Sequence, residues 1–453
     1  PQVSSQQLRR RTNSLYAQAQ FSYDNYLFMD VTGRNDWSST LPESSNSYFY
    51  PSVSGSFVFT DALPGTKLGG LLSYGKLRAS WAQVGNDALP YQLLLTYSAG
   101  APIGSVPTFA VPNTIPNSSL KPEKTRSWET GLELRFLNDR ISLDGTYYSK
   151  LTSNQIIPAQ ISGATGFTSA VLNAGSVTNK GIELQLGATP VRTSGGFSWD
   201  VSVNYARNRS EVVSLLPGLD AVVLGTYWGL SVEARAGQPY GTLYGSPELR
   251  NADGQLILTN GLPQADPQQR VLGHYTPNWV GGIQNTLHYK QFDFSFLVDT
   301  KQGGKIFSTT EMFGQESGVL ASSLRGRENA EALADGGGLL IEGVNADGSP
   351  NTTKVTAQAY FNALFQVHEP YVFDASFVKL REVRFGYTVP SSFSQRMRLS
   401  SIYIAAVGRN LWLNTKVPDI DPETAFDNSN VQGIEYFGVP SARSYGFTLS
   451  VTP

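Results

Sequence analysis

Residues 291–299 read QFDFSFLVD, and their alternation predicts the fold of the chain. Apolar side chains occupy positions 292, 294, 296 and 298, while the polar residues Gln291, Asp293, Ser295 and Asp299 occupy alternate positions. Because successive side chains of a strand point to opposite faces, this stretch predicts a strand with one apolar and one polar face. The same alternation recurs at 140–149, 200–208 and 444–451.

The length of these segments separates two kinds of β-protein. Soluble strands average about five to six residues, whereas a strand that crosses a bilayer obliquely needs about nine to eleven. A soluble β-sandwich alternates too, so segment length and loops must decide between the two. The segments match the longer kind, and the predicted fold class is all-β, an antiparallel transmembrane β-barrel.

Composition agrees with strands and narrows the function. The 453 residues include 44 Gly and 25 Pro, and only 15% are charged, which suits strands joined by turns. No run approaches the roughly 18 consecutive apolar residues of a spanning helix, so a membrane form must be a closed barrel. A net charge of -2 carries no basic face for nucleic acid. Without cysteine there is neither a disulfide framework nor a thiol zinc site, and no cofactor is expected.

Connections between the alternating segments fall into two classes. Outer-membrane barrels have short periplasmic turns and long extracellular loops, and the two classes here alternate in the same way. A short helix is expected near residues 321–333, within one of the long loops. Short connections are predicted at 24–25, 138–139, 191–196, 290–291 and 390–398, and long ones at 85–125, 151–176, 209–277, 303–371 and 413–440.

Thirteen strands are predicted from this pattern. A single-chain bacterial barrel has an even number of strands, so an odd count predicts that at least one preceding strand is missing. The predicted strands lie near 12–23, 26–36, 49–60, 71–84, 126–137, 140–151, 177–190, 197–208, 278–289, 292–303, 372–389, 399–412 and 441–451.

Several stretches, in their order and spacing, resemble the SusC/RagA-like TonB-dependent receptors of the bacterial outer membrane. The match spans nearly the whole chain. The stretches are NSSLKPEKTRSWETGLELRFLNDRISLDGTYYSK (117–150), NAGSVTNKGIELQL (173–186), GQPYGTLYG (237–245), FVKLREVRFGYTVP (377–390), GRNLW (408–412) and DPE (421–423).

This resemblance implies a barrel of roughly 22 strands, occluded by a plug domain. It also implies outer-membrane lipid, a SusD-like lipoprotein and the TonB complex as partners, and glycans or peptides as substrates. The sequence contains no nucleophile elbow, phosphate-binding loop or zincin motif, so no enzymatic activity is expected. We expect residues 1–453 to be the C-terminal part of such a barrel, with the plug domain, the TonB box and the N-terminal strands absent. TonB would then act through the missing N-terminal region.

Candidate functional residues lie in the lumen and loops. Tyr227 and Trp228, in the loop sequence GTYWGL, are candidates for stacking on a sugar or packing against a lipoprotein, with plain loop packing as the alternative. The remaining tryptophans stand near predicted strand ends, where a membrane-interface girdle or sugar stacking would place them. They are Trp37, Trp81, Trp128, Trp199, Trp279 and Trp412. Lumen-facing positions are predicted at Asp200, Asn204, Gln291 and Asp293.

Other chemistry finds little support. The acidic stretches NADGQ (251–255) and NADGSPN (345–351), and the acids of 419–423, lack the spacing of a calcium loop and favour turns. The three histidines, His274, His288 and His368, lack metal-site spacing. Two rival functions stay open: a passive porin or structural barrel, and a soluble all-β adhesin or sugar-binding protein. The soluble protein would bury the phenylalanine row at 292–296.

Overall fold

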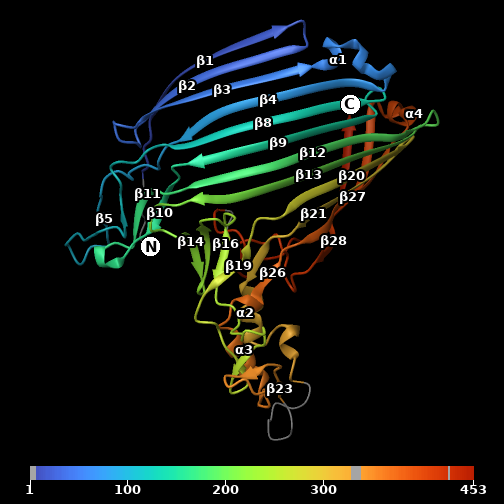
Figure 1. The fold of residues 1–453 in the computed structure, drawn as a ribbon. Helices are drawn as coiled ribbons and strands as arrows, with labels where there is room; N and C mark the ends of the chain where they lie inside the picture. Colours follow the sequence, from blue (N-terminus) through green and yellow to red (C-terminus); the bar gives the residue numbers. More distant parts are fainter. Residues whose placement is uncertain (1–6, 328–337, 427–428) are drawn as a thin grey trace. The chain divides into compact units, whose positions relative to one another are not determined.

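The computed structural model describes residues 7–327, 338–426 and 429–453 (Figure 1). Thirteen long strands form one sheet, in the order β1-β2-β3-β4-β8-β9-β12-β13-β20-β21-β27-β28-β30. All thirteen predicted strands are confirmed. Their bounds are β1 Thr12–Tyr23, β2 Leu27–Ser38, β3 Ser47–Val58, β4 Leu72–Asn86, β8 Glu123–Phe136, β9 Ile141–Ser153, β12 Ser176–Arg192, β13 Phe197–Ser214, β20 Trp279–Tyr289, β21 Phe292–Gln302, β27 Phe377–Thr388, β28 Ser401–Thr415 and β30 Ser444–Thr452.

These strands run from 9 residues in β30 to 18 in β13, the lengths that a tilted membrane crossing requires. The predicted tight turns between them are confirmed. Asp24 and Asn25 have φ of 46° and 59°, and Asn138 and Asp139 have φ of 54° and 66°. Asn and Asp tolerate this left-handed conformation better than most residues, which is why these dipeptides can reverse the chain. None of the described helices has the length and hydropathy to span a membrane.

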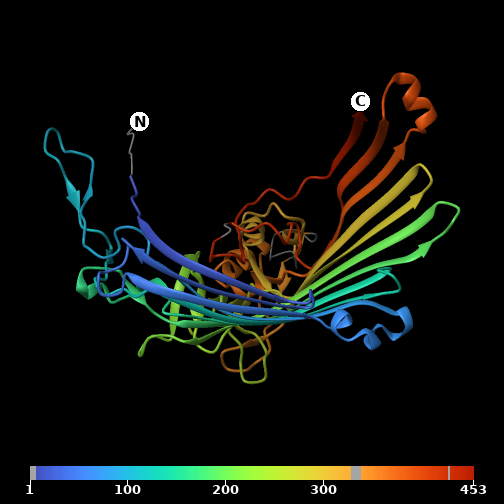
Figure 2. The same cartoon turned by 90° about the horizontal axis from the view of Figure 1, so that it is seen from above.

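The chain divides into two compact units. Unit 1 comprises residues 1–191, 200–222 and 235–238, and its strands succeed one another without a crossover, coloured blue to green in Figures 1 and 2. In β4 and β8, Leu77 pairs with Leu132 and Trp81 with Trp128, and all four side chains are exposed. The alternate face carries charge, because Arg78 reaches Asp144 of β9 at 2.5 Å. One face is therefore apolar and the other ionic.

Unit 2 comprises residues 192–199, 223–234 and 239–453. It contains β20, β21, β27, β28 and β30, together with loop segments that have a core of their own around Leu230, Leu243, Phe307 and Tyr371, all fully buried. The loop strands are short. They include β14 Ala221–Tyr227, β15 Leu230–Arg235, β16 Thr242–Gly245, β19 Arg270–His274, β22 Lys305–Ser308 and β29 Ile434–Glu435.

The long loops contain helices that the sequence did not predict. Helix α2 spans Thr309–Glu316 and α3 spans Ala357–Leu364, each capped by a hydroxyl, Ser308 or Thr356. The predicted helix near 321–333 is wrong in its described part, because only a short 3-10 turn forms at Ala321–Leu324. Residues 328–337 lie outside the described part. Shorter helices α1 and α4 span Phe59–Ala62 and Ser391–Ser394.

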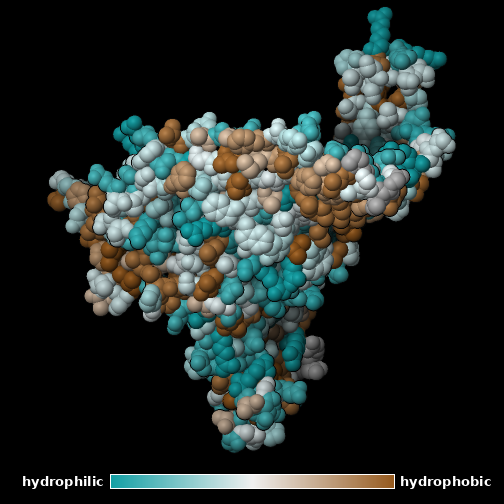
Figure 3. Space-filling view, turned by 45° about the horizontal axis from the view of Figure 1, so that its top comes forward, coloured by the Kyte–Doolittle hydropathy of each residue, from teal (hydrophilic) through white to brown (hydrophobic). Residues whose placement is uncertain are grey.

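Apolar side chains reach the surface of the molecule in patches among polar ones (Figure 3). On β21, Phe292 and Phe294 are 44% and 37% exposed. A soluble β-protein would bury this row, so its exposure opposes the soluble alternative. An exposed apolar face is what hydrocarbon requires.

Candidate functional site

The predicted lumen-facing residues of β13 lie on the polar side of the sheet. Asp200 accepts a hydrogen bond from the Thr189 hydroxyl at 2.6 Å. Asn204, four residues along the same strand, shares its face. Asn208 continues that face, where it receives the Tyr148 hydroxyl at 3.2 Å. Strand periodicity therefore gathers these polar side chains on one surface.

The two candidates near β21 differ in position. Asp293 lies in β21 and accepts a hydrogen bond from the Tyr403 hydroxyl of β28 at 3.0 Å. Gln291 lies outside the strand, in the turn between β20 and β21, where its carbonyl accepts the Thr388 amide at 2.8 Å. Only Asp293 of this pair is placed along the face of a strand.

Tyr227 and Trp228 belong to a cluster of aromatic side chains in unit 2. The rings form an unbroken series of neighbouring contacts from Tyr227 to Trp228, with centroids 4.7–5.5 Å apart, and most contacts are edge-to-face. This is the spacing at which aromatic quadrupoles attract. Three long loops contribute, and we call the set the aromatic cluster: Tyr227, Trp228, Phe313, Phe426, Tyr436 and Phe437.

Half-exposed rings make the aromatic cluster accessible. Trp228, Phe426 and Phe437 are 52%, 48% and 53% exposed. Phe313 connects the aromatic cluster to the core of the loop region, because its ring also packs on Phe365 at a centroid distance of 5.0 Å. Because most of the rings pack edge-to-face against one another, they form one continuous and partly exposed aromatic surface.

The backbone that presents Trp228 is strained. Trp228 and Gly229 form the two-residue turn between β14 and β15, with φ of 52° and 89°. Two central residues with positive φ define a type I′ hairpin turn, which favours Asn-Gly or Gly-Gly. A tryptophan at such a position costs about 1–3 kcal/mol and persists only where its surroundings hold it.

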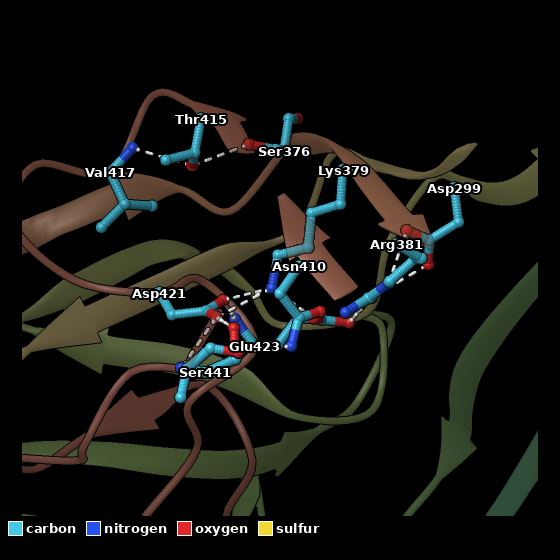
Figure 4. Close-up of polar contacts among 11 residues, drawn as sticks. Asp299, Ser376, Lys379, Arg381, Asn410, Thr415, Val417, Asp421, Glu423 and Ser441 are labelled. Carbon is cyan, nitrogen blue, oxygen red and sulfur yellow. Dashed lines mark hydrogen bonds and ion pairs between the residues drawn. The ribbon is translucent and has the colours of Figure 1, made fainter. Parts of the chain in front are cut away.

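A second group of side chains surrounds the loop that follows β28. It comprises Asp299, Lys379, Arg381, Asp421 and Glu423, which we call the charge cluster (Figure 4). Lys379 Nζ lies 2.7 Å from Asp421 and 2.5 Å from Glu423. Arg381 forms a forked pair with Asp299 at 2.7 and 2.9 Å and reaches Glu423 at 2.5 Å. Glu423 therefore bridges the lysine and the arginine.

A β-bulge positions the charge cluster. Arg381 has no register partner on either β21 or β28, where the pairing shifts around it. Opposite this point, Asn410 has φ of 53° and its amide donates to the Ala442 carbonyl at 3.0 Å. Bulges commonly redirect side chains and end regular pairing. Here the bulge brings the stretches FVKLREV, GRNLW and DPE together.

Two acids of the charge cluster, Asp421 and Glu423, have lowered pKa values. Burial opposes the charge on Asp421, but hydrogen bonds from Lys379 and Ser441 outweigh it and hold the pKa of Asp421 below its ordinary value. Burial likewise acts against Glu423, whose pKa is nevertheless lowered by Arg381 and Lys379. These carboxylates already have cationic side chains as partners, which is not how a calcium site is built. The NADG stretches are turns, with the Asn251 side chain accepting the amides of Asp253 and Gln255.

Sequence reasoning missed most partners of these two clusters. One usable signal was present for Lys379 and Arg381, since they occupy alternate positions of a strand and the apolar residues Val378 and Leu380 stand beside them. Nothing local pointed to Phe313, Phe426 or Phe437, because they come from separate loops. Trp228 was identified, but its ring partners were not.

Long antiparallel strands with one exposed apolar face and one ionic face define a β-barrel protein of the bacterial outer membrane. The chain belongs to the family of TonB dependent receptor-like β-barrels, whose family model matches residues 1–280. Members of this family are transport proteins and not enzymes. The predicted resemblance to SusC/RagA-like receptors is confirmed.

Individual relatives agree with the family. The chain is 26% identical to TonB-dependent receptor P3 of Formosa agariphila, over 97% of this chain and 45% of that protein. It is 25% identical to TonB-dependent receptor SusC of Bacteroides thetaiotaomicron, over 84% of this chain and 38% of that protein. The RagAB peptide transporter shares the fold, with a TM-score of 0.77 and 20% identity over 98% of this chain and 48% of that one. The chain spans less than half the length of each.

Proposed function

We propose that this chain forms barrel wall and external loops of a TonB-dependent importer of large nutrients, glycans or peptides, that works with a SusD-like lipoprotein. The aromatic cluster is the observation that carries the proposal beyond the family. Three separate loops bring exposed rings together at one surface. Trp228 is exposed at this surface although its backbone has a strained, positive φ. Exposed aromatics mark sites of contact with ligands or partners.

The chemistry of this surface fits either proposed role. Ring faces stack on the C–H face of a sugar, and they equally cover the apolar side chains of a lipoprotein. We propose Tyr227 and Trp228 as the contact residues of this site. We further propose that Asp200, Asn204, Gln291 and Asp293 line the route through the lumen, where polar groups would replace the hydration of a passing substrate.

Uptake by the full-length receptor tests the proposal. Cells are grown on panels of oligosaccharides and of peptides as sole carbon source, with the receptor gene intact or deleted, and with TonB present or absent. We expect deletion of either gene to abolish growth on one class. Uptake without TonB, or open conductance in a planar bilayer, would establish the passive porin instead.

Point substitutions then test the site. We expect Trp228→Ala to lower uptake or the co-purification of the lipoprotein. Trp412→Ala is the matched control, because Trp412 is 50% exposed but lies on β28, outside the aromatic cluster. Equal effects of the two substitutions would remove Trp228 from the site.

A further inference from the structure

His368 is the one side chain of the described residues that a hydrogen bond joins to the strained Trp228 backbone. It is 6% exposed and packs edge-on against Phe307. Its Nε2 lies 2.8 Å from the Trp228 carbonyl oxygen, although the two residues are 140 positions apart. Its Nδ1 receives the Ser246 amide at 2.9 Å.

These two contacts determine the protonation of the ring. The Ser246 amide can only donate, so Nδ1 must carry a lone pair. The Trp228 carbonyl can only accept, so Nε2 must carry the hydrogen. The imidazole is therefore neutral, in a single tautomer, with both nitrogens occupied.

Two glycines of the surrounding backbone, Gly229 and Gly245, leave room for the imidazole ring. A Cβ added at Gly229 would lie 3.1 Å from Nε2, and one at Gly245 would lie 3.0 Å from Nδ1. Both are closer than real Cβ contacts normally allow, so the glycines clear the space on either side of the imidazole. The His368 amide also donates to the Ser246 carbonyl at 3.0 Å, which clamps the base of the ring to the end of β16.

We propose that His368 is the positioning residue of the aromatic cluster: its neutral imidazole ties the Trp228 turn to the loop core and so holds the indole at the surface. The inference rests on the proposed contact role of Trp228 and adds a means of regulation. A doubly protonated ring could no longer accept the Ser246 amide. Acidification therefore releases the clamp and, with it, the orientation of Trp228.

The acidic side chains near the imidazole are engaged in contacts with other groups. Glu369, next along the chain, directs Oε2 to the Glu248 amide at 2.9 Å, and Glu248 itself is bound by Arg250 at 2.5 Å. Burial lowers the pKa of His368 below its ordinary value of 6.5, against a smaller opposite effect of the Trp228 carbonyl. The ring thus stays neutral at pH 7 and becomes charged only in more acidic medium.

Two near-isosteric substitutions separate the contacts. His368→Gln keeps an amide donor where Nε2 stood, and His368→Asn keeps an oxygen acceptor where Nδ1 stood. The receptor is labelled with 5-fluorotryptophan, and the Trp228 fluorine resonance is assigned by its disappearance in Trp228→Phe. We expect His368→Asn to shift and broaden that resonance, and His368→Gln to leave it near its wild-type position.

A pH titration of the Trp228 fluorine resonance distinguishes the proposed role from a purely structural one. A histidine that only fills space would not make this resonance depend on pH. In the wild type the Trp228 resonance should shift as the pH falls below 6.5, whereas in His368→Gln it should not. An unchanged Trp228 resonance in His368→Asn, or an identical titration in His368→Gln, would overturn the proposal. If His368→Asn also shifts the other tryptophan resonances, the substitution has disturbed the fold more widely. The pH titration of His368→Gln then decides whether His368 positions Trp228.

The same variants keep the two proposals apart. A shifted Trp228 resonance together with normal uptake by Trp228→Ala would leave the positioning role intact and refute the contact role. The reverse result, impaired uptake by Trp228→Ala with no shift in His368→Asn, would retain the site and remove His368 from it.

Discussion

Two groups of buried acids in unit 2 behave in opposite ways. In the charge cluster, Asp421 is 4% exposed, and cationic partners hold its pKa below the ordinary value. In helix α2, Glu311 is fully buried, and burial together with Asp419 and Glu435 raises its pKa to about 7. Both are carboxyl groups within the loop region. The difference shows that neighbouring charge, and not burial alone, decides whether a buried acid is ionised.

The two buried acids of the second group, Glu311 and Glu435, differ in the number of hydrogen bonds that their side chains accept. Glu435, also fully buried, accepts hydrogen bonds from Ser308, from both the amide and the hydroxyl of Thr310, and from the Gly438 amide. Glu311 accepts a hydrogen bond from Gln315, and its other side-chain hydrogen bond, with Asp419, raises its pKa. Glu311, with fewer donors, is the acid of this group whose pKa is raised, and it keeps a proton near neutral pH.

The largest expected effect comes from breaking the charge cluster. Lys379→Met would leave Asp421 buried without its ammonium, and removal of one member of a buried pair costs about 3–5 kcal/mol. The free energy of unfolding in urea from lipid vesicles measures the loss. Arg409→Met is the control, since Arg409 is 63% exposed and its pair with Glu382 is worth about 0–1 kcal/mol. Equal losses would contradict the assigned difference between buried and exposed pairs.

The second prediction concerns Glu311 and has a defined pH window. The folded state holds a proton that the unfolded chain releases near pH 4.5, so stability falls as the pH rises from 4.5 to about 7. The loss is on the order of 3 kcal/mol. Glu311→Gln should remove this pH dependence in urea titrations carried out across the window.

Glu435→Gln is the comparison for Glu311→Gln, and here we expect a loss of stability at pH 7. It replaces a carboxyl group that accepts from four donors by an amide with a single acceptor oxygen, so stability should fall by about 1–3 kcal/mol at pH 7. If Glu311→Gln destabilised the protein as strongly as Glu435→Gln at that pH, Glu311 would not hold a proton there and the distinction between the two acids would fail.

The smallest expected effect concerns Asp421 in acid. Because its folded pKa is lowered, its contribution is fully present above the ordinary value of 3.8 and is lost as the pH falls through the depressed pKa. Asp421→Asn keeps one oxygen that can accept from Lys379 and removes the negative charge, while Glu423 still pairs with the ammonium, so we expect a loss of about 1 kcal/mol at pH 7. Hydrogen exchange of residues 417–425, corrected for the intrinsic pH effect, should show a weaker acid dependence than in the wild type.

The sequence alone predicted the thirteen strands and the tight turns between them. Alternation has a period of two residues, and a turn needs only neighbouring residues, so both are legible in short windows. Local propensity was less reliable in the long loops. Helix α2 contains two threonines and a glycine, poor helix formers that a Ser308 cap and burial in the loop core overcome.

Tertiary structure alone decided which side chains meet. Lys379 finds Asp421 across 42 residues, and His368 finds the Trp228 carbonyl across 140. A charged or aromatic residue has no periodic signature that names its distant partner, and its protonation depends on those partners. Trp228 could therefore be singled out from its sequence, whereas the strained turn, the histidine that holds it and the rings around it exist only in the folded chain.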